Sequence, residues 1–457
     1  MFDVAGFFES FVDDVKRGPV APHIAFGDTL RYLADRYPFD APVPLREVAD
    51  DVRRMLLHGN LHTTHPAYFG LFNPHVTLAS VVADAMAASA NPQVGGWFHS
   101  PAAVEIEQHV LHFFARRFGF DDDSLAHFTS GGSEANATAV MCALARRFPE
   151  WRRGGARALA KQPVLFVSVE AHHSFEKIAQ QTGLGRDAVR LIDVDERDRM
   201  RPDALERAIA ETRANGEEPF FVVATAGTTG SGAIDPLPEI ADICARENLW
   251  MHADAAWGGA AAVSDRLRVH LAGIERADSI TCDAHKWISV AMGAGMFFTR
   301  HREVLREAFS VDTPYVPKEE SGPDHYALSL QWSRRFIGLK VFLTLAELGA
   351  DGLARQIEHH AAMADVLRDR LIANGWNVIS DSPLAIVCFT RDDVDIPAIA
   401  TAVVKEGRAW ISPLVREGRP PALRACVTNY ETSERDIDTL MRALETARTS
   451  YNREQPQ

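Results

Sequence analysis

Short apolar runs alternate with amphipathic stretches through the middle of the chain. Apolar residues at helical spacing occur, for example, at 203–211 and 238–247. Runs rich in aromatic and β-branched residues predict buried strands at 164–169, 219–226, 249–254, 279–283 and 295–299. Strands that alternate with helices are typical of a largely parallel sheet flanked by helices, so the sequence predicts an α/β fold.

The two ends of the chain follow other patterns. Prolines interrupt the helical stretches of residues 1–62, and a loop rich in proline, glycine and charge occupies 313–326. Beyond about residue 374, strand-like and helical stretches mix in a tail of the size of a small α+β domain. We expect an N-terminal helical segment at 1–62, a large domain at 63–345 and a small C-terminal domain at 346–457.

Composition narrows the class of protein. The chain has 457 residues and a formal net charge of −14, which argues against non-specific binding to nucleic acid or to anionic membranes. No apolar run reaches the length of a membrane span, and acidic residues in the first segment argue against a signal peptide. The five cysteines are scattered without metal-binding spacing, so we expect reduced core thiols, no metal site and a cytoplasmic location.

The segment TSGGSEAN at 129–136 directly precedes a predicted helix. Glycines and serines at a helix start expose backbone N–H groups, which suit a phosphate group. Gly132 and Ser133 are therefore candidate phosphate ligands, although a plain turn would explain the same residues.

Further polar residues lie at the carboxyl ends of predicted strands, where sheets of this kind bind ligands. His172, Thr225 and Asp254 have ordinary alternatives: a loop histidine, a plain turn, and a cap or salt bridge. Lys286 alone is typical of a surface cation whose stem lies along Trp287. Together these residues offer a phosphate cradle, a flat-ring neighbour, a buried anion and an amine, which a phosphorylated pyridine aldehyde needs.

Motifs across roughly residues 60–445 carry a family resemblance. They are HPAYFG (65–70), SPAAVEIE (100–107), TSGGSEAN, AHHSFEK (171–177), ATAGTTGSGAIDP (224–236), HADAAWGG (252–259), DSITCDAHKW (278–287) and SLQWSRRF (329–336). In this order they resemble the group II pyridoxal-phosphate-dependent amino-acid decarboxylases, of the aromatic-L-amino-acid and glutamate decarboxylase superfamily. The resemblance implies the fold-type I, aspartate-aminotransferase-like architecture. It also implies a homodimer with shared active sites, in which segment 1–62 packs on the partner subunit.

By the resemblance, three residues act on the cofactor ring and the reacting bond. Lys286 would anchor pyridoxal 5'-phosphate as a Schiff base, and Asp254 would pair with the pyridinium nitrogen. His172 would stack over the ring near the substrate carboxylate. Pyridoxal 5'-phosphate is thus the expected cofactor, and an amino acid the expected substrate.

The resemblance places the other cofactor contacts at the phosphate and the ring edge. Gly132 and Ser133 would hold the phosphate, and His285 would also reach it. Thr225 would contact the ring edge, and Asp283 would occupy a polar position near the phosphate.

A tyrosine on a loop usually returns the proton in this family. Tyr326 lies close to the expected place, but its spacing to the SRRF motif is about one residue shorter than the usual pattern. Tyr315 is the second candidate. We predict Tyr326 as the donor, and a tyrosine favours simple decarboxylation over oxidative deamination to an aldehyde.

Aromatic residues dominate the segments that line the substrate side in relatives, although they could equally be core or dimer interface. We therefore expect a substrate with an aromatic or medium-sized apolar side chain. The residues are Phe72, Asn73, His75, Trp97, Phe98 and Trp332.

Other functions stay open at this point. The same fold supports aminotransferases and other lyases, in which Arg424 would clamp the substrate carboxylate; a structural role for Arg424 in a strand is preferred. A catalytically silent binding protein would lack the lysine or the aspartate, and both Lys286 and Asp254 are present.

Overall fold

The chain divides into two compact units in a computed structural model that describes residues 3–121, 123–311, 324–416 and 418–454. The large unit comprises Val76–Ala361 and Ser380–Ile386. The small unit comprises Met1–His75, Ala362–Ile379 and Val387–Gln457. The division into three parts at residues 62 and 345 stays a prediction.

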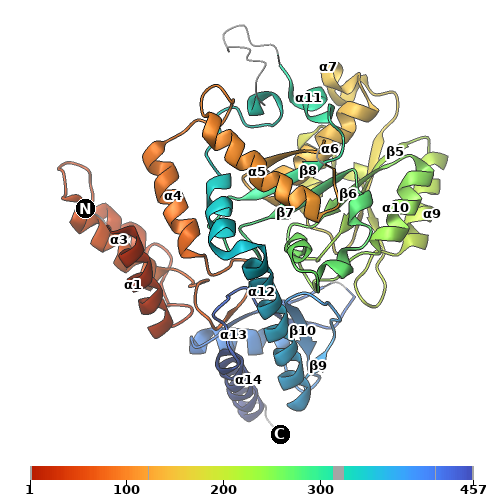
Figure 1. Ribbon diagram of the computed structural model, residues 1–457. Helices are drawn as coiled ribbons and strands as arrows, with labels where there is room; N and C mark the ends of the chain where they lie inside the picture. Colours follow the sequence, from red (N-terminus) through yellow and green to blue (C-terminus); the bar gives the residue numbers. More distant parts are fainter. Residues whose placement is uncertain (1–2, 122, 312–323, 417, 455–457) are drawn as a thin grey trace. The chain divides into compact units, whose positions relative to one another are not determined.

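The large unit is built on a mostly parallel sheet (Figure 1). Its strands are β2 (Leu125–Thr129), β3 (Pro163–Ser168), β4 (Val189–Ile192), β5 (Glu218–Thr225), β6 (Trp250–Asp254), β7 (Ser279–Asp283) and β8 (Gly295–Thr299). Among the described residues their order is β2-β8-β7-β6-β5-β3-β4, and β8 runs antiparallel to both of its neighbours. Every residue of β3, β6, β7 and β8 is buried, as expected for strands covered on both faces. The predicted α/β class is confirmed.

The helices of the large unit are α4 (Leu78–Ala90), α5 (Pro101–Arg117), α6 (Gly132–Arg147), α7 (Trp151–Gly154), α8 (Ser174–Gln181), α9 (Pro202–Ala214), α10 (Leu237–Glu247), α11 (Val304–Phe309) and the first part of α12 (Gly338–Ala373). Several of them contact this sheet, namely α5, α6, α8, α9 and α10. Helix α6 contacts β2, β5, β6, β7 and β8, and the small buried residues Ala135, Ala139 and Ala143 allow this close approach. Helices α9 and α10 pack on β4, β5 and β6 (Figure 1).

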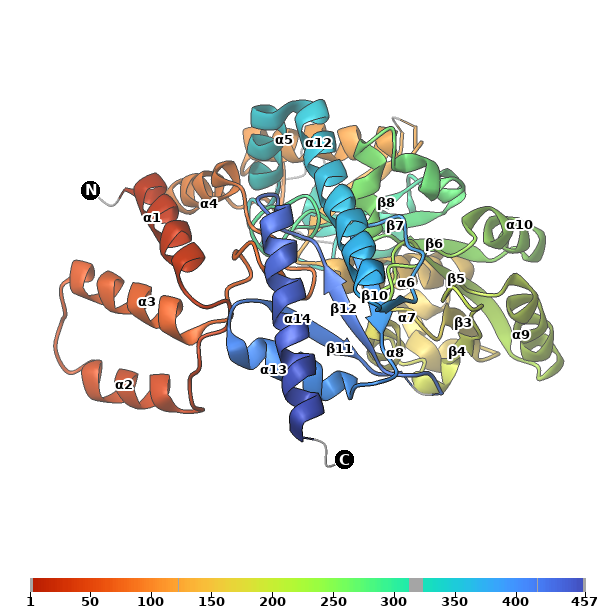
Figure 2. The ribbon, with the colours of Figure 1, turned by 90° about the horizontal axis from the view of Figure 1, so that it is seen from below.

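The small unit has its own sheet, whose order among the described residues is β1-β11-β12-β10-β9. The strands are β1 (Tyr68–Phe69), β9 (Asn377–Val378), β10 (Ile386–Thr390), β11 (Trp410–Leu414) and β12 (Ala422–Cys426). The helices are α1 (Val4–Arg17), α2 (Asp28–Arg36), α3 (Leu45–Gly59), the last part of α12, α13 (Ile396–Glu406) and α14 (Glu434–Glu454). Figure 2 shows α13 beside α14, and α13 also packs on β11 and β12.

The cysteines behave as core residues. All five are free and buried. Burial raises the pKa of Cys426 to about 12, so its thiol stays protonated and unreactive near neutral pH. In the described part of the chain, no helix combines the length and the apolar character needed to cross a bilayer.

Candidate active site

Polar side chains meet at the ends of three neighbouring parallel strands. Thr225 ends β5, Asp254 ends β6 and Asp283 ends β7. The strand register sets Thr225 opposite Asp254, and Asp254 opposite Thr281. All of these residues are buried. In sheets of this kind, the carboxyl ends of the strands commonly face the crevice in which a ligand binds. The structure thus brings three of the predicted site residues to one edge of the sheet.

Lys286 lies in the turn that follows β7, with its amine at the carboxylate of Asp283. The distance from Lys286 Nζ to Asp283 Oδ2 is 3.0 Å, and the lysine side chain is 21% exposed. The next residue, Trp287, is fully buried; its ring stacks on that of Trp257, and its Nε1–H donates to His360. Trp287 therefore fixes the turn by packing, and the Lys286 amine is partly desolvated at the sheet edge.

His285 lies beside the same carboxylate. Its Nε2 is 3.9 Å from Asp283 Oδ2, and its Nδ1 accepts a hydrogen bond from the Ala294 N–H at 3.1 Å. Burial lowers the pKa of His285, although the charge of Asp283 opposes this shift. A neutral ring whose Nδ1 accepts must carry its proton on Nε2, so His285 presents a donor at the Asp283 side of the site.

The turn before α6 comes close to Asp283 because it contains glycines. A Cβ on Gly132 would lie 2.9 Å from Asp283 Oδ2, and a Cβ on Gly295 would lie 2.6 Å from Gly131 Cα. Within the described chain, the backbone N–H groups of Gly132 and Ser133 donate no hydrogen bond, and Ser133 is exposed. The positive end of a 16-residue helix therefore opens at this edge, where it favours an anion.

His172 lies in the turn between β3 and α8, and its side chain is exposed. Its Nδ1 accepts a hydrogen bond from the Ser174 N–H at 3.2 Å. The surrounding protein atoms lower the pKa of His172, and the nearby carboxylate of Asp254 opposes this shift while Lys286 adds to it. His172 is thus close enough to Asp254 and Lys286 to feel both charges.

Asp254 is a buried carboxylate that accepts hydrogen bonds from neutral N–H groups. Its Oδ2 accepts from Asn136 Nδ2 at 2.9 Å, and its Oδ1 accepts from the Ala256 N–H at 3.2 Å. Within the described residues Asp254 forms no salt bridge, although it is only 5% exposed. Because a buried anion without a counter-ion is costly, this position suits a cationic group on a ligand.

Two other buried oxygens at this edge have no hydrogen-bond partner among the described residues. They are Thr225 Oγ1 and Asp283 Oδ1. An unsatisfied buried polar atom costs about 1–3 kcal/mol and often marks a place where a ligand binds. A desolvated amine, free N–H groups at a helix start and an unpaired anion fit the aldehyde, phosphate and ring nitrogen of pyridoxal 5'-phosphate.

The sequence interpretation missed the residues behind Asp254. Asn136 lies one helical turn after Gly132 on α6, and its Oδ1 is 3.0 Å from His252 Nε2. His252 in turn lies 2.8 Å from Ser279 Oγ on the neighbouring strand. Asn136 belongs to the motif TSGGSEAN, one helical turn after Gly132, and His252 belongs to HADAAWGG, two strand positions before Asp254. These spacings put each residue on the same face as its site neighbour, and they could have indicated both residues.

Tyr326 lies in a short 3-10 segment, His325–Ala327, of the large unit. Its backbone N–H donates to the Gly95 carbonyl at 2.8 Å, and its ring centroid is 5.1 Å from that of Trp332. The side chain is 9% exposed. The other candidate donor, Tyr315, lies outside the described residues.

The residues expected on the substrate side fall in both units. Trp97, Phe98 and Trp332 belong to the large unit, whereas Phe72, Asn73 and His75 belong to the small unit. Arg424 is buried in β12, where it donates to the Gly70 carbonyl at 2.7 Å and lies 4.9 Å from the centre of the Phe72 ring. These contacts agree with the preferred structural role of Arg424.

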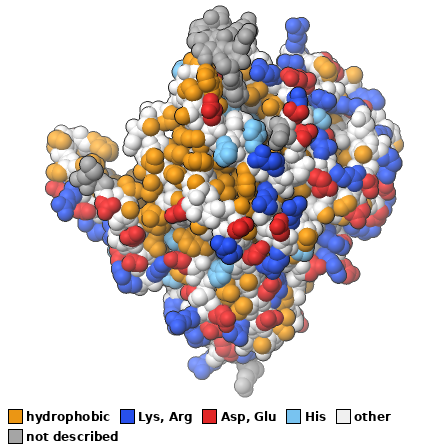
Figure 3. All heavy atoms as spheres, in the orientation of Figure 1, with side chains coloured by type: hydrophobic (Ala, Val, Ile, Leu, Met, Phe, Trp, Pro, Cys, Tyr) orange, Lys and Arg blue, Asp and Glu red, His pale blue; other side chains and the backbone are white. Residues whose placement is uncertain are grey.

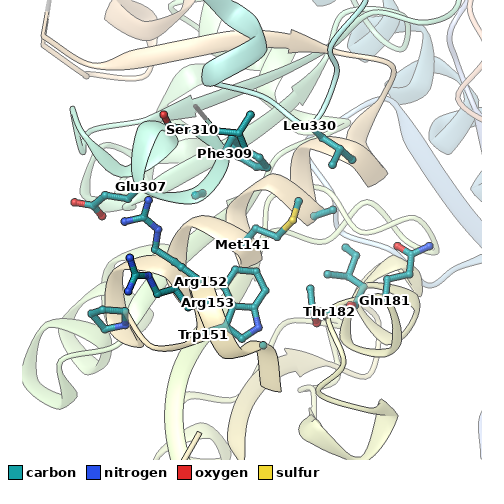
Figure 4. A pocket seen from close by; sticks show the side chains of 16 residues that line it. Met141, Trp151, Arg152, Arg153, Gln181, Thr182, Glu307, Phe309, Ser310 and Leu330 are labelled. Atoms are coloured by element: carbon teal, nitrogen blue, oxygen red, sulfur yellow. Dashed lines mark hydrogen bonds between the residues drawn. The ribbon is translucent and has the colours of Figure 1, made fainter. Parts of the chain in front are cut away.

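A hollow of about 840 Å³ lies elsewhere on the large unit, between α6, α7, α8 and α11 (Figure 4). Met141, Trp151, Thr182 and Phe309 line it. None of the predicted site residues is among its described lining residues.

Comparisons with known proteins agree with these features. The mouse cysteine sulfinic acid decarboxylase is 32% identical over 420 residues, which cover 86% of this chain and 84% of the relative. The aromatic-L-amino-acid decarboxylase of Bacillus atrophaeus is 30% identical over 383 residues, which cover 83% and 78%. A crystal structure of Oryza sativa TDC with PLP and tryptamine is 25% identical, with a TM-score of 0.89 over 97% of this chain and 96% of that one.

The family follows from the sequence motifs, the fold and these relatives together. Residues 28–391 match the pyridoxal-dependent decarboxylase conserved domain, which is most of the chain. The fold is accordingly that of the pyridoxal-phosphate-dependent decarboxylases, and the cofactor is pyridoxal 5'-phosphate. The chain belongs to the group II pyridoxal-phosphate-dependent decarboxylases and is an amino-acid carboxy-lyase.

Proposed function

We propose that this decarboxylase acts on an L-amino acid with an aromatic or medium-sized apolar side chain and releases the amine and CO2. The edge of the sheet where Lys286, Asp283 and Asp254 meet the start of α6 carries the proposal. Relatives include decarboxylases named for a sulfinic acid and for aromatic substrates, so the side-chain class rests on this chain's own residues. Trp97 and Phe98 of the large unit support an apolar side chain.

Pyridoxal phosphate, when bound, supplies the electron sink for the electron pair left when CO2 departs. We assign Lys286 as its covalent anchor, because the amine is held 3.0 Å from Asp283 at the strand ends. Asp254 would accept a hydrogen bond from the protonated ring nitrogen and keep that nitrogen cationic. The Thr225 hydroxyl, unsatisfied among the described residues, would contact the ring edge.

The phosphate end of the cofactor is assigned to the start of α6. The N–H groups of Gly132 and Ser133 would donate to the phosphate oxygens, assisted by the helix dipole. His285 would add a donor from Nε2, since its Nδ1 is already occupied by the Ala294 N–H. Asp283 orients the Lys286 amine and, through its second oxygen, offers an acceptor in the same place.

His172 and a tyrosine are assigned to the reacting bond. His172 lies on an exposed turn near Asp254 and Lys286, from which it would cover the ring and orient the carboxylate that is lost. A tyrosine hydroxyl would return the proton to Cα. Tyr326 is the predicted donor and Tyr315 the alternative, and substitution of each decides between them.

The substrate class is tested with a panel of amino acids. The holoenzyme is incubated with each common amino acid, and amine, CO2, aldehyde, hydrogen peroxide and 2-oxo acid are measured together. We expect equal amounts of amine and CO2 from aromatic or medium-sized apolar substrates. Preferential turnover of aspartate or cysteine sulfinate would contradict the substrate class, and aldehyde with hydrogen peroxide would contradict the reaction.

We further propose a homodimer with shared active sites in the cytoplasm. In Figure 3, hydrophobic side chains gather on the exposed side of the large unit over α4 and α5. Met86 of α4 is 52% exposed, and partly buried Trp97, Ile106 and Phe342 pack against the apolar cluster that α4 and α5 form with the start of α12. Such a patch is larger than single scattered residues and fits a subunit interface. Light scattering during size-exclusion chromatography should give twice the monomer mass; a monomer at micromolar concentration would contradict this proposal.

A further inference from the structure

A continuous chain of hydrogen bonds runs behind Asp254, and its centre is Asn136. Asn136 Nδ2 donates to Asp254 Oδ2 at 2.9 Å and also lies 3.4 Å from Ser174 Oγ. On its other side, Asn136 Oδ1 is 3.0 Å from His252 Nε2, a shorter contact than the 3.4 Å between that nitrogen and Thr281 Oγ1. Asn136 is 1% exposed and His252 is fully buried, so water does not compete for these bonds.

The donors and acceptors of this chain have a single consistent order. Burial lowers the pKa of His252 to about 4, so the ring is neutral near pH 7 and carries one proton. Asp254 accepts, which directs Asn136 Nδ2 toward it and leaves Oδ1 to accept from His252 Nε2–H. His252 Nδ1 then accepts from Ser279 Oγ–H at 2.8 Å, and Ser279 accepts from Trp250 Nε1–H at 2.9 Å. The opposite amide orientation would set an oxygen against the carboxylate.

The same amide reaches the turn that carries His172. Ser174, whose Oγ lies 3.4 Å from Asn136 Nδ2, donates its backbone N–H to His172 Nδ1 at 3.2 Å. One side chain on α6 therefore contacts β6 through Asp254 and His252, and α8 through Ser174.

We propose that Asn136 is a positioning residue that aims the Asp254 carboxylate at the cofactor nitrogen, with His252 fixing the orientation of the Asn136 amide. This inference rests on the proposed role of Asp254. A hydrogen bond donated to a carboxylate favours its charged form. Because His252 accepts from Ser279 and donates to Asn136, the amide cannot turn over without losing two bonds.

The isosteric substitution Asn136→Asp tests the donor directly. It replaces the N–H with an oxygen beside Asp254, so one of two adjacent carboxylates must take up a proton. We expect faster release of the cofactor, a changed absorption spectrum of the bound cofactor, and a kcat about 10- to 100-fold lower with KM nearly unchanged, as for outer-shell partners of metal ligands. The matched control is Thr138→Val on the same helix. The buried Thr138 hydroxyl donates to the Glu134 carbonyl at 2.9 Å. This variant should have the cofactor release, absorption spectrum and kcat of the wild type.

A pair of His252 variants tests the second link and covers the case in which Asn136→Asp does not fold. The amide nitrogen of His252→Gln can replace the Nε2–H donor, whereas His252→Leu cannot. We expect the glutamine variant to retain the cofactor and its spectrum, and the leucine variant to lose both. Equal behaviour of the two variants, or wild-type cofactor retention and spectrum in a folded Asn136→Asp protein, would overturn the inference.

Asp254→Asn separates this inference from the function on which it rests. If Asp254→Asn keeps cofactor binding and turnover, the role of Asp254 itself is wrong. If Asp254→Asn loses turnover while Asn136→Asp keeps the wild-type cofactor spectrum and release rate, the role of Asp254 stands and the role of Asn136 is wrong. Thermal unfolding of each apoprotein, measured in parallel, reports whether the substituted chain is folded.

Discussion

The two buried carboxylates of the candidate site, Asp283 and Asp254, have different neighbours. Asp283 lies 3.0 Å from the Lys286 amine, whereas Asp254 receives neutral N–H donors from Asn136 and Ala256. A carboxylate with a lysine beside it has its counter-ion, but a buried carboxylate with neutral donors still needs a cation for full compensation. This difference supports the proposed pairing of Asp254, rather than Asp283, with the ring nitrogen of the cofactor.

Thr225→Val should separate stability from cofactor binding. The Thr225 hydroxyl is buried without a hydrogen-bond partner among the described residues, so removing it should leave the apoprotein as stable as wild type or more stable by about 1 kcal/mol. Loss of the ring-edge contact should raise the Kd for the cofactor. Urea unfolding of the apoprotein and a cofactor titration measure the two effects.

Thr228→Val is the matched control, because the Thr228 hydroxyl is also buried but accepts from the Ala233 N–H at 3.1 Å. It should destabilise the apoprotein by about 1–3 kcal/mol. A Thr225→Val apoprotein destabilised to the same extent, with unchanged cofactor affinity, would contradict the assignment of Thr225.

Tyr326→Phe and Tyr315→Phe identify the proton donor. The prediction is that Tyr326→Phe slows amine release or diverts the product to an aldehyde, because the phenylalanine cannot return a proton to Cα. Tyr315→Phe should then keep normal product and rate. The reverse outcome would assign the proton to Tyr315 and leave Tyr326 as a packing residue against Trp332, with which its ring is in contact.

At the level of single elements, the start of α6 is the proposed phosphate-binding site. Gly132→Ala would place a Cβ 2.9 Å from Asp283 Oδ2, so either the turn or the Asp283 carboxylate must shift. We expect a Kd for pyridoxal phosphate about 10-fold or more higher, because the first shift displaces the N–H donors and the second displaces the carboxylate that holds the Lys286 amine.

The control for Gly132→Ala is Gly352→Ala in α12. Its Cβ would lie 3.2 Å from Leu348 Cβ, far along the chain from the proposed site, so helix propensity should offset this contact. Fluorescence titration of each apoprotein with the cofactor gives both affinities. Equal affinities in the two variants would mean that the phosphate does not bind at this helix start.

Local sequence patterns predicted some strands correctly and missed others. The strand predictions at 279–283 and 295–299 match β7 and β8. Strand β4 was not predicted because it is a half-exposed edge strand, and β2 was not predicted because His127 interrupts its apolar pattern.

Residues of the candidate site could be predicted where they belong to sequence motifs. Hydrogen bonds between distant parts of the chain could not be predicted. The motifs name Lys286, Asp254 and the α6 start, and the structure brings them to one sheet edge. The bond from Asn136 to Asp254 spans 118 positions in the chain, so it depends on how α6 crosses β6. A local sequence pattern does not indicate where α6 crosses β6.

At the scale of the whole molecule, buried histidines couple folding to pH. Burial lowers the pKa of His127 and of His252 to about 4, and that of His360 to about 3, all below the ordinary value of 6.5. The unfolded chain therefore binds protons below pH 6.5 that the folded chain does not bind. Stability should be complete above that pH and fall as the pH falls toward 4, by up to about 1.4 kcal/mol per pH unit for each histidine.

Urea unfolding of the apoprotein between about pH 7.5 and pH 5 measures this slope. His360→Asn keeps an acceptor for Trp287 Nε1–H, which now donates to His360 Nδ1 at 2.8 Å, and removes one titrating group. Its slope should be shallower than that of the wild type. A free energy of unfolding that is constant over this range would contradict the neutral state of these histidines.

The most direct test of the central claim is to locate the covalently bound cofactor. The holoenzyme is reduced with borohydride, digested and mapped by mass spectrometry. We predict that the cofactor mass is found on Lys286, in the peptide that contains DAHKW, and that Lys286→Ala protein carries none after the same treatment. Stoichiometric cofactor on any other lysine of the wild-type chain would contradict the assignment of this sheet edge as the active site.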